Sequence, residues 1–425
     1  MTAPRDKLGR PVVVVTGMGI MTSLGNGKAD NWAKLVAGES GIRTITRFPV
    51  DGLKTTMAGT VDFVSVDPFS STGLSERMAE LVTQEALDQA GIGAKADFPG
   101  PLFLAVAPVE VEWPQRRELG RAVGAQDITY DDLLRISGGG KYSAYHHRFM
   151  FGSVAAYLAE TFGTKGSPIS LSTACASGAT SIQLGVEAIR RGETDAALCV
   201  ATDGTVNPEA LVRFSLLSAL STQNDPPQAA SRPFSKNRDG FVMAEGAGAL
   251  VLESYEAATA RGAKILGVIA GCGELTDSFH RTRSSPDGGP AIATIRAALA
   301  DAGMAETDIG YINAHGTSTP ENDKMEYGAM SAVFGERLPT IPVSSNKSMI
   351  GHTLTAAGAV EAVFSLQTML TGTLPPTINY NNPDPTIILD VVPNQKREKQ
   401  VSAILSNSFG FGGQNASLVM ALEPA

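Results

Sequence analysis

The sequence has few cysteines, few histidines and no excess of positive charge. Its three cysteines, Cys175, Cys199 and Cys272, are an odd number for 425 residues, which argues against a disulfide framework and for a reducing compartment. A formal net charge of −9 gives nucleic acid no basic surface to bind. No apolar run is long enough to span a membrane, and the first residues lack the apolar segment of a secretory signal. We therefore expect a cytoplasmic, globular protein that binds neither nucleic acid nor a membrane.

Metal-ligand and cofactor motifs are also missing. The spacings H-x-x-H, H-E-x-x-H and C-x-x-C do not occur, so we expect no metal site. A glycine turn is predicted at residues 16–22, after a buried strand at 12–15. Thr22, however, stands where the dinucleotide fingerprint G-x-G-x-x-G needs its third glycine. We therefore predict no bound cofactor.

Helical and strand patterns alternate along the chain, which is typical of the α/β class. Helices are predicted at residues 76–90, 151–162 and 176–189, and strands at 102–106, 168–171, 196–201 and 249–252. Residues 107–150 carry mixed turn signals, and we interpret them as an insertion over the sheet that faces a partner or the substrate. His146 and His147 within this insertion are interpreted as surface or pocket residues.

The second half of the chain repeats the first. Four segments form two matched pairs in the same order, 86–91 with 298–303 and 178–192 with 358–372. This order indicates an internal duplication with a boundary near Gly262, and hence domains of residues 1–262 and 263–425. We expect two mixed sheets packed face to face in five layers, αβαβα. The helix after Cys175 and its equivalent near Gly358 would share the middle layer.

A nucleophile is predicted at Cys175. Residues 169–178, Ile-Ser-Leu-Ser-Thr-Ala-Cys-Ala-Ser-Gly, combine a short strand, a turn of small residues and the start of a helix. A side chain at this bend lies at the helix N-terminus, where unpaired N–H groups and the helix dipole favour negative charge. We expect this position to lower the thiol pKa from about 8.5. The alternative is a small buried apolar residue, which the position at the bend makes less favoured.

Two of the five histidines lie in small-residue turns that follow predicted strands. His315 opens His-Gly-Thr-Ser-Thr-Pro, and His352 ends Lys-Ser-Met-Ile-Gly-His, which begins at Lys347. In the duplicated fold both turns fall at the same end of the sheets as Cys175. A single histidine in such a turn is more often a hydrogen-bonded structural residue, but two beside a reactive cysteine favour catalysis.

A glycine-dense loop, Phe-Gly-Phe-Gly-Gly at 409–413, follows a strand predicted at 401–405. Glycines after a strand let the backbone approach a ligand and point N–H groups inward, as an oxyanion hole requires. The alternative is an ordinary turn. The presence of Cys175 favours the oxyanion hole.

These motifs together resemble the condensing enzymes, specifically the elongating β-ketoacyl-[acyl carrier protein] synthases I and II. The likeness rests on Ala-Cys-Ala-Ser-Gly at 174–178, Asn-Ala-His-Gly-Thr-Ser-Thr-Pro at 313–320, Asn-Lys-Ser-Met-Ile-Gly-His at 346–352 and the loop at 409–413. It implies a thiolase-like fold, a duplicated αβαβα five-layer sandwich, and a homodimer. It also implies an acyl carrier protein as partner, whose phosphopantetheine arm carries the substrates.

The resemblance assigns roles to nine residues. Cys175 would hold the acyl group, and His315 and His352 would donate hydrogen bonds to the enolate that forms when malonyl carrier loses CO₂. The remaining assignments are Lys347 and Glu361 beside the histidines, Phe409 and Phe411 at the gate and second oxyanion hole, and Thr317 and Thr319 on the pantetheine arm.

Several positions depart from the family pattern. Asn322 replaces a glycine, Gln414 replaces a threonine, and residues 105–113 replace a glycine-rich stretch that lines the acyl pocket. The preference for chain length therefore does not transfer. Arg77 and Arg213 are candidates for carrier docking.

Four alternatives remain. One is a condensing enzyme of a specialised long-chain or polyketide pathway. The second is a non-catalytic chain-length factor, which would lack the cysteine. The third, a thiolase or chain-initiating synthase, would use Cys-His-Asn or a second cysteine. The fourth, a cysteine hydrolase of unrelated fold, would leave the duplication unexplained.

Overall fold

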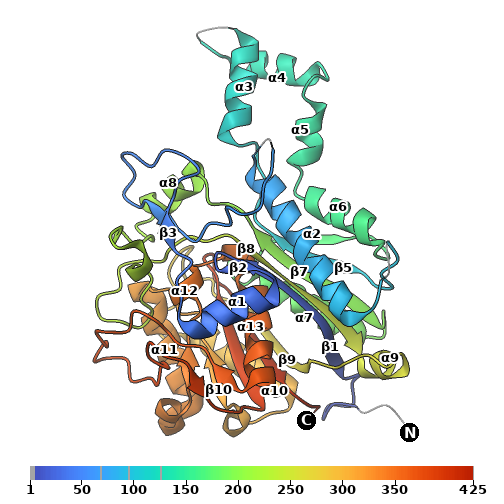
Figure 1. The fold of residues 1–425 in the computed structure, drawn as a ribbon, viewed down its shortest axis with the longest axis vertical. Helices are drawn as coiled ribbons and strands as arrows, with labels where there is room; N and C mark the ends of the chain where they lie inside the picture. The colour runs from blue at the N-terminus through green and yellow to red at the C-terminus, as the bar shows by residue number, and fades with distance from the viewer. Residues whose placement is uncertain (1–4, 68, 94–95, 125–126, 425) are drawn as a thin grey trace.

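The computed structural model describes residues 5–67, 69–93, 96–124 and 127–424. A mixed sheet runs through the molecule (Figure 1). Ten of its eleven strands form two sets of five, and the short β2 pairs with β1 beside them. In spatial order the N-terminal set is β1 (Val13–Thr22), β8 (Gly246–Ser254), β7 (Ala196–Asp203), β5 (Leu102–Val106) and β6 (Ile169–Leu171). The C-terminal set is β9 (Gly267–Thr276), β15 (Gln414–Ala421), β14 (Ala403–Phe409), β10 (Tyr311–Asn313) and β11 (Val343–Ser344).

The two sets have the same topology. The five strands of each set can be numbered in the order in which they occur along the chain. Read across the sheet from β1 or from β9, both sets then have the order first, fifth, fourth, second, third. The first two pairings are antiparallel and the next two are parallel. This repetition confirms the predicted duplicated α/β fold. Among the described residues, hydrogen bonds join the two sets only where β1 pairs with β9, at Val14–Val268 and Val15–Gly267, so the two expected sheets are continuous at this edge. The domain division at residue 262 stays a prediction.

Helices cover both outer faces of the sheet and fill the space between the sets. α2 (Ser71–Ala90) packs on β1 and β8, α10 (Gly289–Ala302) packs on β9 and β15, and α7 (Ser177–Arg190) and α13 (Ala357–Thr371) pack on one another in the middle. The other helices are α1 (Gly27–Ala37), α3 (Trp113–Val123), α4 (Tyr130–Gly138), α5 (Ser143–Arg148), α6 (Ser153–Phe162), α8 (Pro208–Leu216), α9 (Tyr255–Ala260), α11 (Pro320–Phe334) and α12 (Lys347–Ile350). The short strands are β2 (Gly25–Asn26), β3 (Arg43–Thr44), β4 (Met57–Ala58), β12 (Thr373–Leu374) and β13 (Arg397–Glu398).

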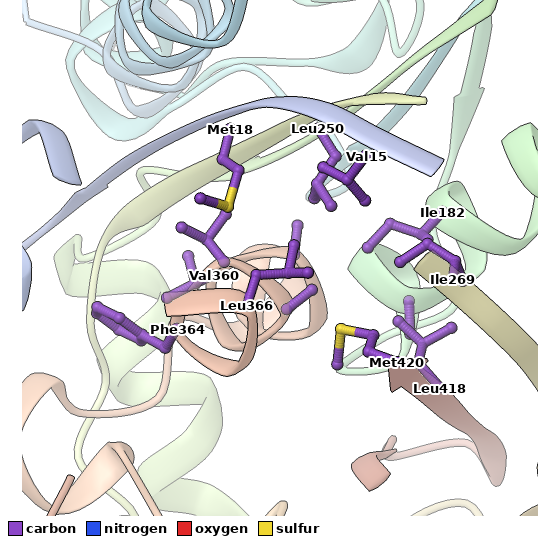
Figure 2. Close-up of a cluster of buried hydrophobic side chains, with 14 of the residues drawn as sticks. Val15, Met18, Ile182, Leu250, Ile269, Val360, Phe364, Leu366, Leu418 and Met420 are labelled. Carbon is purple, nitrogen blue, oxygen red and sulfur yellow. The ribbon is translucent and has the colours of Figure 1, made fainter. Parts of the chain in front are cut away.

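The middle layer holds the main apolar core. Figure 2 shows side chains of α13 and α7 between those of β1 and β8 on one side and of β9 and β15 on the other. The backbones of the two helices approach one another directly at Gly178 and Gly358. A Cβ atom built on Gly178 would lie 2.5 Å from the Ala359 nitrogen, and one built on Gly358 would lie 2.4 Å from the Ala179 nitrogen. The prediction that these two helices share the middle layer is therefore confirmed.

The matched segments 86–91 and 298–303 are equivalent helix ends. α2 stops at Ala90 and α10 at Ala302, and each is followed by a glycine in the left-handed conformation, Gly91 with φ 65° and Gly303 with φ 61°. Only glycine adopts this conformation without strain, so the same residue closes both helices.

The predicted glycine turn at residues 16–22 is wrong. β1 continues through it to Thr22, and Gly17 and Gly19 lie directly beneath α2. A Cβ on Gly17 would lie 2.0 Å from the Ala86 carbonyl oxygen, and one on Gly19 would lie 1.9 Å from that of Val82. The glycines therefore allow a helix to approach a strand closely, and they do not turn the chain.

Helices α3, α4 and α5 form an arm that points away from the rest of the molecule (Figure 1). Residues 107–150 were expected to lie over the sheet, and this placement is wrong for the helical part. Large apolar side chains remain exposed on the arm, with Trp113 at 57% and Tyr130 at 73% of their full area. Among the described residues, no helix is both long and apolar enough to cross a membrane.

Candidate active site

The turn between β6 and α7 is the predicted elbow. Ala174, just before Cys175, has a φ of 50°, a conformation that costs a non-glycine residue about 1–3 kcal/mol. Ser177 stabilises the bend, because its hydroxyl accepts a hydrogen bond from the Thr173 N–H at 2.8 Å and donates to the Ala174 carbonyl at 2.6 Å. The strain is confined to the position that places Cys175 before the first turn of α7.

The structure brings the two predicted histidines to this cysteine. His315 follows β10, and His352 follows α12. The His352 Nε2 lies 3.1 Å from the Cys175 Sγ, and the two imidazole rings have centroids 5.2 Å apart at an interplanar angle of 84°. One ring nitrogen of each histidine and the sulfur all lie within 4.8 Å of one another. Residues from both halves of the duplication therefore share one site.

A buried lysine fixes His315. Lys347 and Glu361 are each only 1% exposed, and the Lys347 ammonium donates to a Glu361 carboxylate oxygen. Lys347 Nζ also donates to the His315 carbonyl oxygen at 2.8 Å and lies 3.3 Å from His315 Nδ1. Since an ammonium has only donors, Nδ1 accepts this hydrogen bond and the proton of the neutral ring is on Nε2.

The His352 ring has the same tautomer as the His315 ring. Its Nδ1 accepts a hydrogen bond from the Leu354 N–H at 3.3 Å, which leaves its proton on Nε2 as well. Burial lowers the pKa of both histidines well below the ordinary value, and the charge of Lys347 adds to this effect. Both rings are therefore neutral and present an Nε2–H to the site.

Cys175 is a thiol in the resting site. Burial raises its pKa to about 11, and this exceeds the opposing effects of the Phe411 N–H and the Lys347 charge. The predicted lowering of this pKa is therefore wrong. A helix N-terminus does favour the thiolate, as predicted from the sequence. The sequence does not show how far the thiol is buried, and burial disfavours the thiolate more strongly.

The sulfur and the two imidazoles are also close enough to be considered as metal ligands. A histidine that binds a metal through Nε2 normally donates its Nδ1–H to a carboxylate or carbonyl oxygen. Here both Nδ1 atoms face donors, the Lys347 ammonium and the Leu354 N–H. This arrangement suits hydrogen bonding to an anion better than binding of a cation.

The glycine-dense loop closes the site from the other side. Phe409 lies 6.0 Å from the His315 ring, and Phe411 lies 6.4 Å from the Phe241 ring, both between ring centroids. The Gly410 N–H donates to the Gln414 carbonyl at 2.7 Å, so the loop is held by backbone contacts that do not depend on the Gln414 side chain. The Phe411 N–H faces the Cys175 sulfur and acts to lower the pKa of the thiol.

Two cavities meet at Cys175. The first has a volume of about 290 Å³, and its lining includes His315, His352, Phe409, Thr317 and Thr319. The second has a volume of about 430 Å³ and runs past α8, the start of α2 and residues 106–112. Phe411 and Leu354 line both cavities. The sulfur therefore lies between two compartments, one of which contains the histidines.

Arg77 and Arg213, the residues predicted to dock the carrier, lie outside the lining of the first cavity. Arg213 lines the second cavity and pairs with Glu110 at 2.5 Å, while Arg77 pairs with Glu80 on the surface of α2. Neither residue lines the cavity that holds the histidines, whose lining instead includes Arg283. No sequence pattern marks this arginine, because the loop that carries it reaches the site only through the fold.

A second buried carboxylate was also missed. Glu326 accepts hydrogen bonds from the N–H groups of His315 at 2.8 Å and Gly316 at 2.7 Å, and burial raises its pKa to about 7. It therefore fixes the backbone that carries His315. Asn322 lies near it in the first turn of α11 and lines the first cavity.

Comparisons with known proteins agree with this geometry. Residues 10–258 match the model of the β-ketoacyl synthase N-terminal domain, and residues 266–381 match that of the C-terminal domain. A 3-oxoacyl-[acyl-carrier-protein] synthase 2 of Coxiella burnetii is 38% identical over 421 residues, which cover 96% of this chain and 98% of that protein. The ketoacyl synthase alpha subunit of the tetracenomycin polyketide synthase of Streptomyces glaucescens is 36% identical over 428 residues, or 96% of each chain.

A solved structure is similar over almost the whole chain. It is a type II polyketide ketosynthase in complex with its acyl-carrier protein and bound to the hexaketide, with a TM-score of 0.85 and 34% identity. The match covers 97% of this chain and 100% of that one. Both family models, the relatives and the fold agree, and the chain belongs to the β-ketoacyl synthase family.

Proposed function

We propose that the protein is a 3-oxoacyl-[acyl carrier protein] synthase of fatty acid elongation, which condenses malonyl carrier with an enzyme-bound acyl group and releases CO₂. The observation that supports this most is the meeting of a cysteine sulfur and two Nε2–H donors where two cavities join. One cavity can hold the acyl group while the other admits the second substrate.

In the first step Cys175 takes the acyl group from its carrier. The sulfur attacks the thioester carbonyl, the bond to the pantetheine sulfur breaks, and the cysteine proton leaves with that sulfur. The oxyanion of this step forms beside the Phe411 N–H and the Cys175 N–H. Preorganised donors of this kind contribute about 10²–10³ each in rate. The acyl chain then extends into the second cavity.

In the second step malonyl carrier enters the first cavity. Loss of CO₂ places negative charge on the thioester oxygen, and the Nε2–H groups of His315 and His352 donate to it. Neutral imidazoles suit this role. At any pH above its lowered pKa, each ring carries a single proton, and that proton is on Nε2.

In the third step the enolate carbon attacks the acyl-Cys175 carbonyl. The new carbon–carbon bond forms, the bond to the cysteine sulfur breaks, and the released thiolate takes up a proton. Thr317 and Thr319, whose hydroxyls lie 2.9 Å apart on the wall of the first cavity, would hold the pantetheine arm during this step.

The surfaces and relatives of the protein support two kinds of partner, an acyl carrier protein and a second copy of this chain. The similar ketosynthase solved together with its acyl-carrier protein supports a carrier as partner, entering by the first cavity near Arg283. The exposed apolar side chains of the arm, such as Trp113 and Tyr130, support a homodimer, since monomers rarely expose such patches. The three cysteines are free, which agrees with a cytoplasmic location.

A polyketide condensing enzyme is the second candidate. It is supported by the 36% identity to the tetracenomycin ketoacyl synthase alpha subunit over 96% of this chain. The same three steps apply to both candidates, and they differ only in the acyl group that the second cavity holds.

Substitution of the nucleophile tests the function. Cys175→Ala should lose condensation of malonyl carrier with every acyl group and retain decarboxylation of malonyl carrier, because both histidines remain. Cys272→Ala, which changes a thiol outside both cavities, is the matched control and should keep both activities. Condensation by Cys175→Ala at the wild-type rate would contradict the proposal.

A further inference from the structure

The second cavity has an acidic group in its wall. Glu112 follows β5 in the segment that lines the cavity, and only 7% of its area is exposed. One carboxylate oxygen, Oε1, accepts hydrogen bonds from the N–H groups of Ser71 at 2.7 Å and Thr72 at 3.4 Å. These are the first residues of α2, so the carboxylate satisfies two N–H groups in the first turn of that helix, which Ser70 caps.

The other oxygen of Glu112 remains available. Among the described residues no hydrogen bond is made to Oε2. Burial is the largest influence on Glu112 and raises its pKa, and the charge of Glu209 adds to this effect. The N–H groups of Ser71 and Thr72 and the Ser71 hydroxyl lower it. The Glu112 carboxyl is thus an acceptor that lines an otherwise largely apolar space.

The wall carries further polar groups. Ser75 and Thr72 line the same space as Glu112, and the ion pair between Arg213 and Glu110 lies along it. A plain alkyl chain that filled this cavity would displace water from these groups without replacing its hydrogen bonds. Leaving a buried polar group unpaired in this way weakens binding.

We propose that the acyl group held in the second cavity carries a hydroxyl group, which donates a hydrogen bond to Glu112. This inference rests on the proposed function, because it names the acyl chain that Cys175 accepts. A hydroxyl supplies the donor that the carboxylate needs, whereas a ketone has only acceptors. An ammonium group would also donate, but burying its charge in a largely apolar space costs far more than burying a hydroxyl.

The test compares acyl groups of equal chain length, each attached to the carrier as a thioester. One has a plain chain, and the others carry a single hydroxyl that is moved carbon by carbon toward the far end. The rate of acylation of Cys175 is followed by intact-protein mass, and condensation with malonyl carrier is followed by CO₂ release. The wild-type protein should prefer one hydroxylated chain to the plain chain by about tenfold or more, as expected for a hydrogen bond to a charged group.

Glu112→Gln isolates the proposed contact. The amide oxygen can still accept from Ser71 and Thr72, so the contacts with α2 are kept, while the group facing the cavity changes from an acceptor to an NH₂ donor. The substrate hydroxyl can still accept a hydrogen bond from this NH₂, but the bond is then between neutral groups and is weaker than one to a carboxylate. The preference for the hydroxylated chain should therefore fall about fivefold, with little change for the plain chain, which also shows that the variant is folded. Glu118→Gln, on the arm and outside the cavity lining, is the matched control and should keep the preference.

Three results would overturn the inference. A plain chain that is the best substrate of the wild-type protein would do so, and so would an unchanged preference in Glu112→Gln. In both cases condensation still occurs and the proposed function stands. If no chain acylates Cys175, the proposed function fails together with the inference.

Discussion

The buried ion pair of Lys347 and Glu361 should decide both stability and catalysis. Each side chain is 1% exposed, and Lys347 also holds His315 through its carbonyl oxygen and Nδ1. In Lys347→Met the Glu361 carboxylate would stay buried without its cation. Breaking a buried pair by removing one partner costs about 3–5 kcal/mol in the free energy of unfolding.

The loss should depend on pH. Burial already raises the pKa of Glu361 from 4.5 to about 7, and Lys347 is the group that opposes this rise. Without Lys347 the folded protein should hold the Glu361 proton more tightly still. A raised pKa gives a stabilising contribution at low pH that is lost as the pH rises through the folded-state value. Lys347→Met should therefore be least stable, relative to wild type, in alkaline solution.

Urea unfolding followed by circular dichroism, on either side of a pH of about 7, measures this change. The double variant Lys347→Met/Glu361→Gln removes both charges and should recover most of the stability. Neither variant should decarboxylate malonyl carrier well, because His315 Nδ1 loses its donor. A single variant that loses less than about 1 kcal/mol in alkaline solution, or a double variant as unstable as the single one, would refute the reasoning.

Three further predictions concern other parts of the molecule. Alkylation of Cys175 by iodoacetamide should be slow near neutrality and rise about tenfold per pH unit toward a pKa of about 11, and a plateau near neutral pH would contradict the assigned burial effect. Gly358→Ala should lower the free energy of unfolding by about 1–3 kcal/mol, because the new Cβ lies 2.4 Å from the Ala179 nitrogen. The matched Gly328→Ala, whose Cβ meets nothing within 4 Å in α11, should raise it by up to about 1 kcal/mol, and equal effects in thermal melts would be inconsistent with the packing. Trp113→Glu should shift the protein toward a monomer in sedimentation, whereas an unchanged mass would show that the arm is not part of a dimer interface.

The sequence predicted those elements whose causes are local. The strand at 102–106 and the elbow at Cys175 were found because an apolar run bounded by turn residues suffices to define each. The duplication was found because equivalent helices end on the same small residues, as at Gly91 and Gly303.

Features that depend on a second segment were missed or wrong. Gly17 in β1 was taken for part of a turn because only α2 above it explains the glycine. The shift in the pKa of Cys175 was predicted in the wrong direction, because the residues that bury the thiol come from parts of the chain outside the local pattern. Arg283, Glu326 and the carboxylate of Glu112 carry no motif, and each reaches its place only when distant segments form one wall.

The direct contact of α7 with α13 has a consequence for how this protein can change. α7 begins two residues after Cys175, and α13 begins five residues after His352. Since no side chain separates Gly178 from Gly358, the contact is a fixed reference point for both reacting groups. Loops, cavity walls and surfaces can diverge to suit new substrates while sulfur and imidazole keep their spacing. The spacing between the Cys175 sulfur and the His352 ring thus depends on two glycines, which have no side chains.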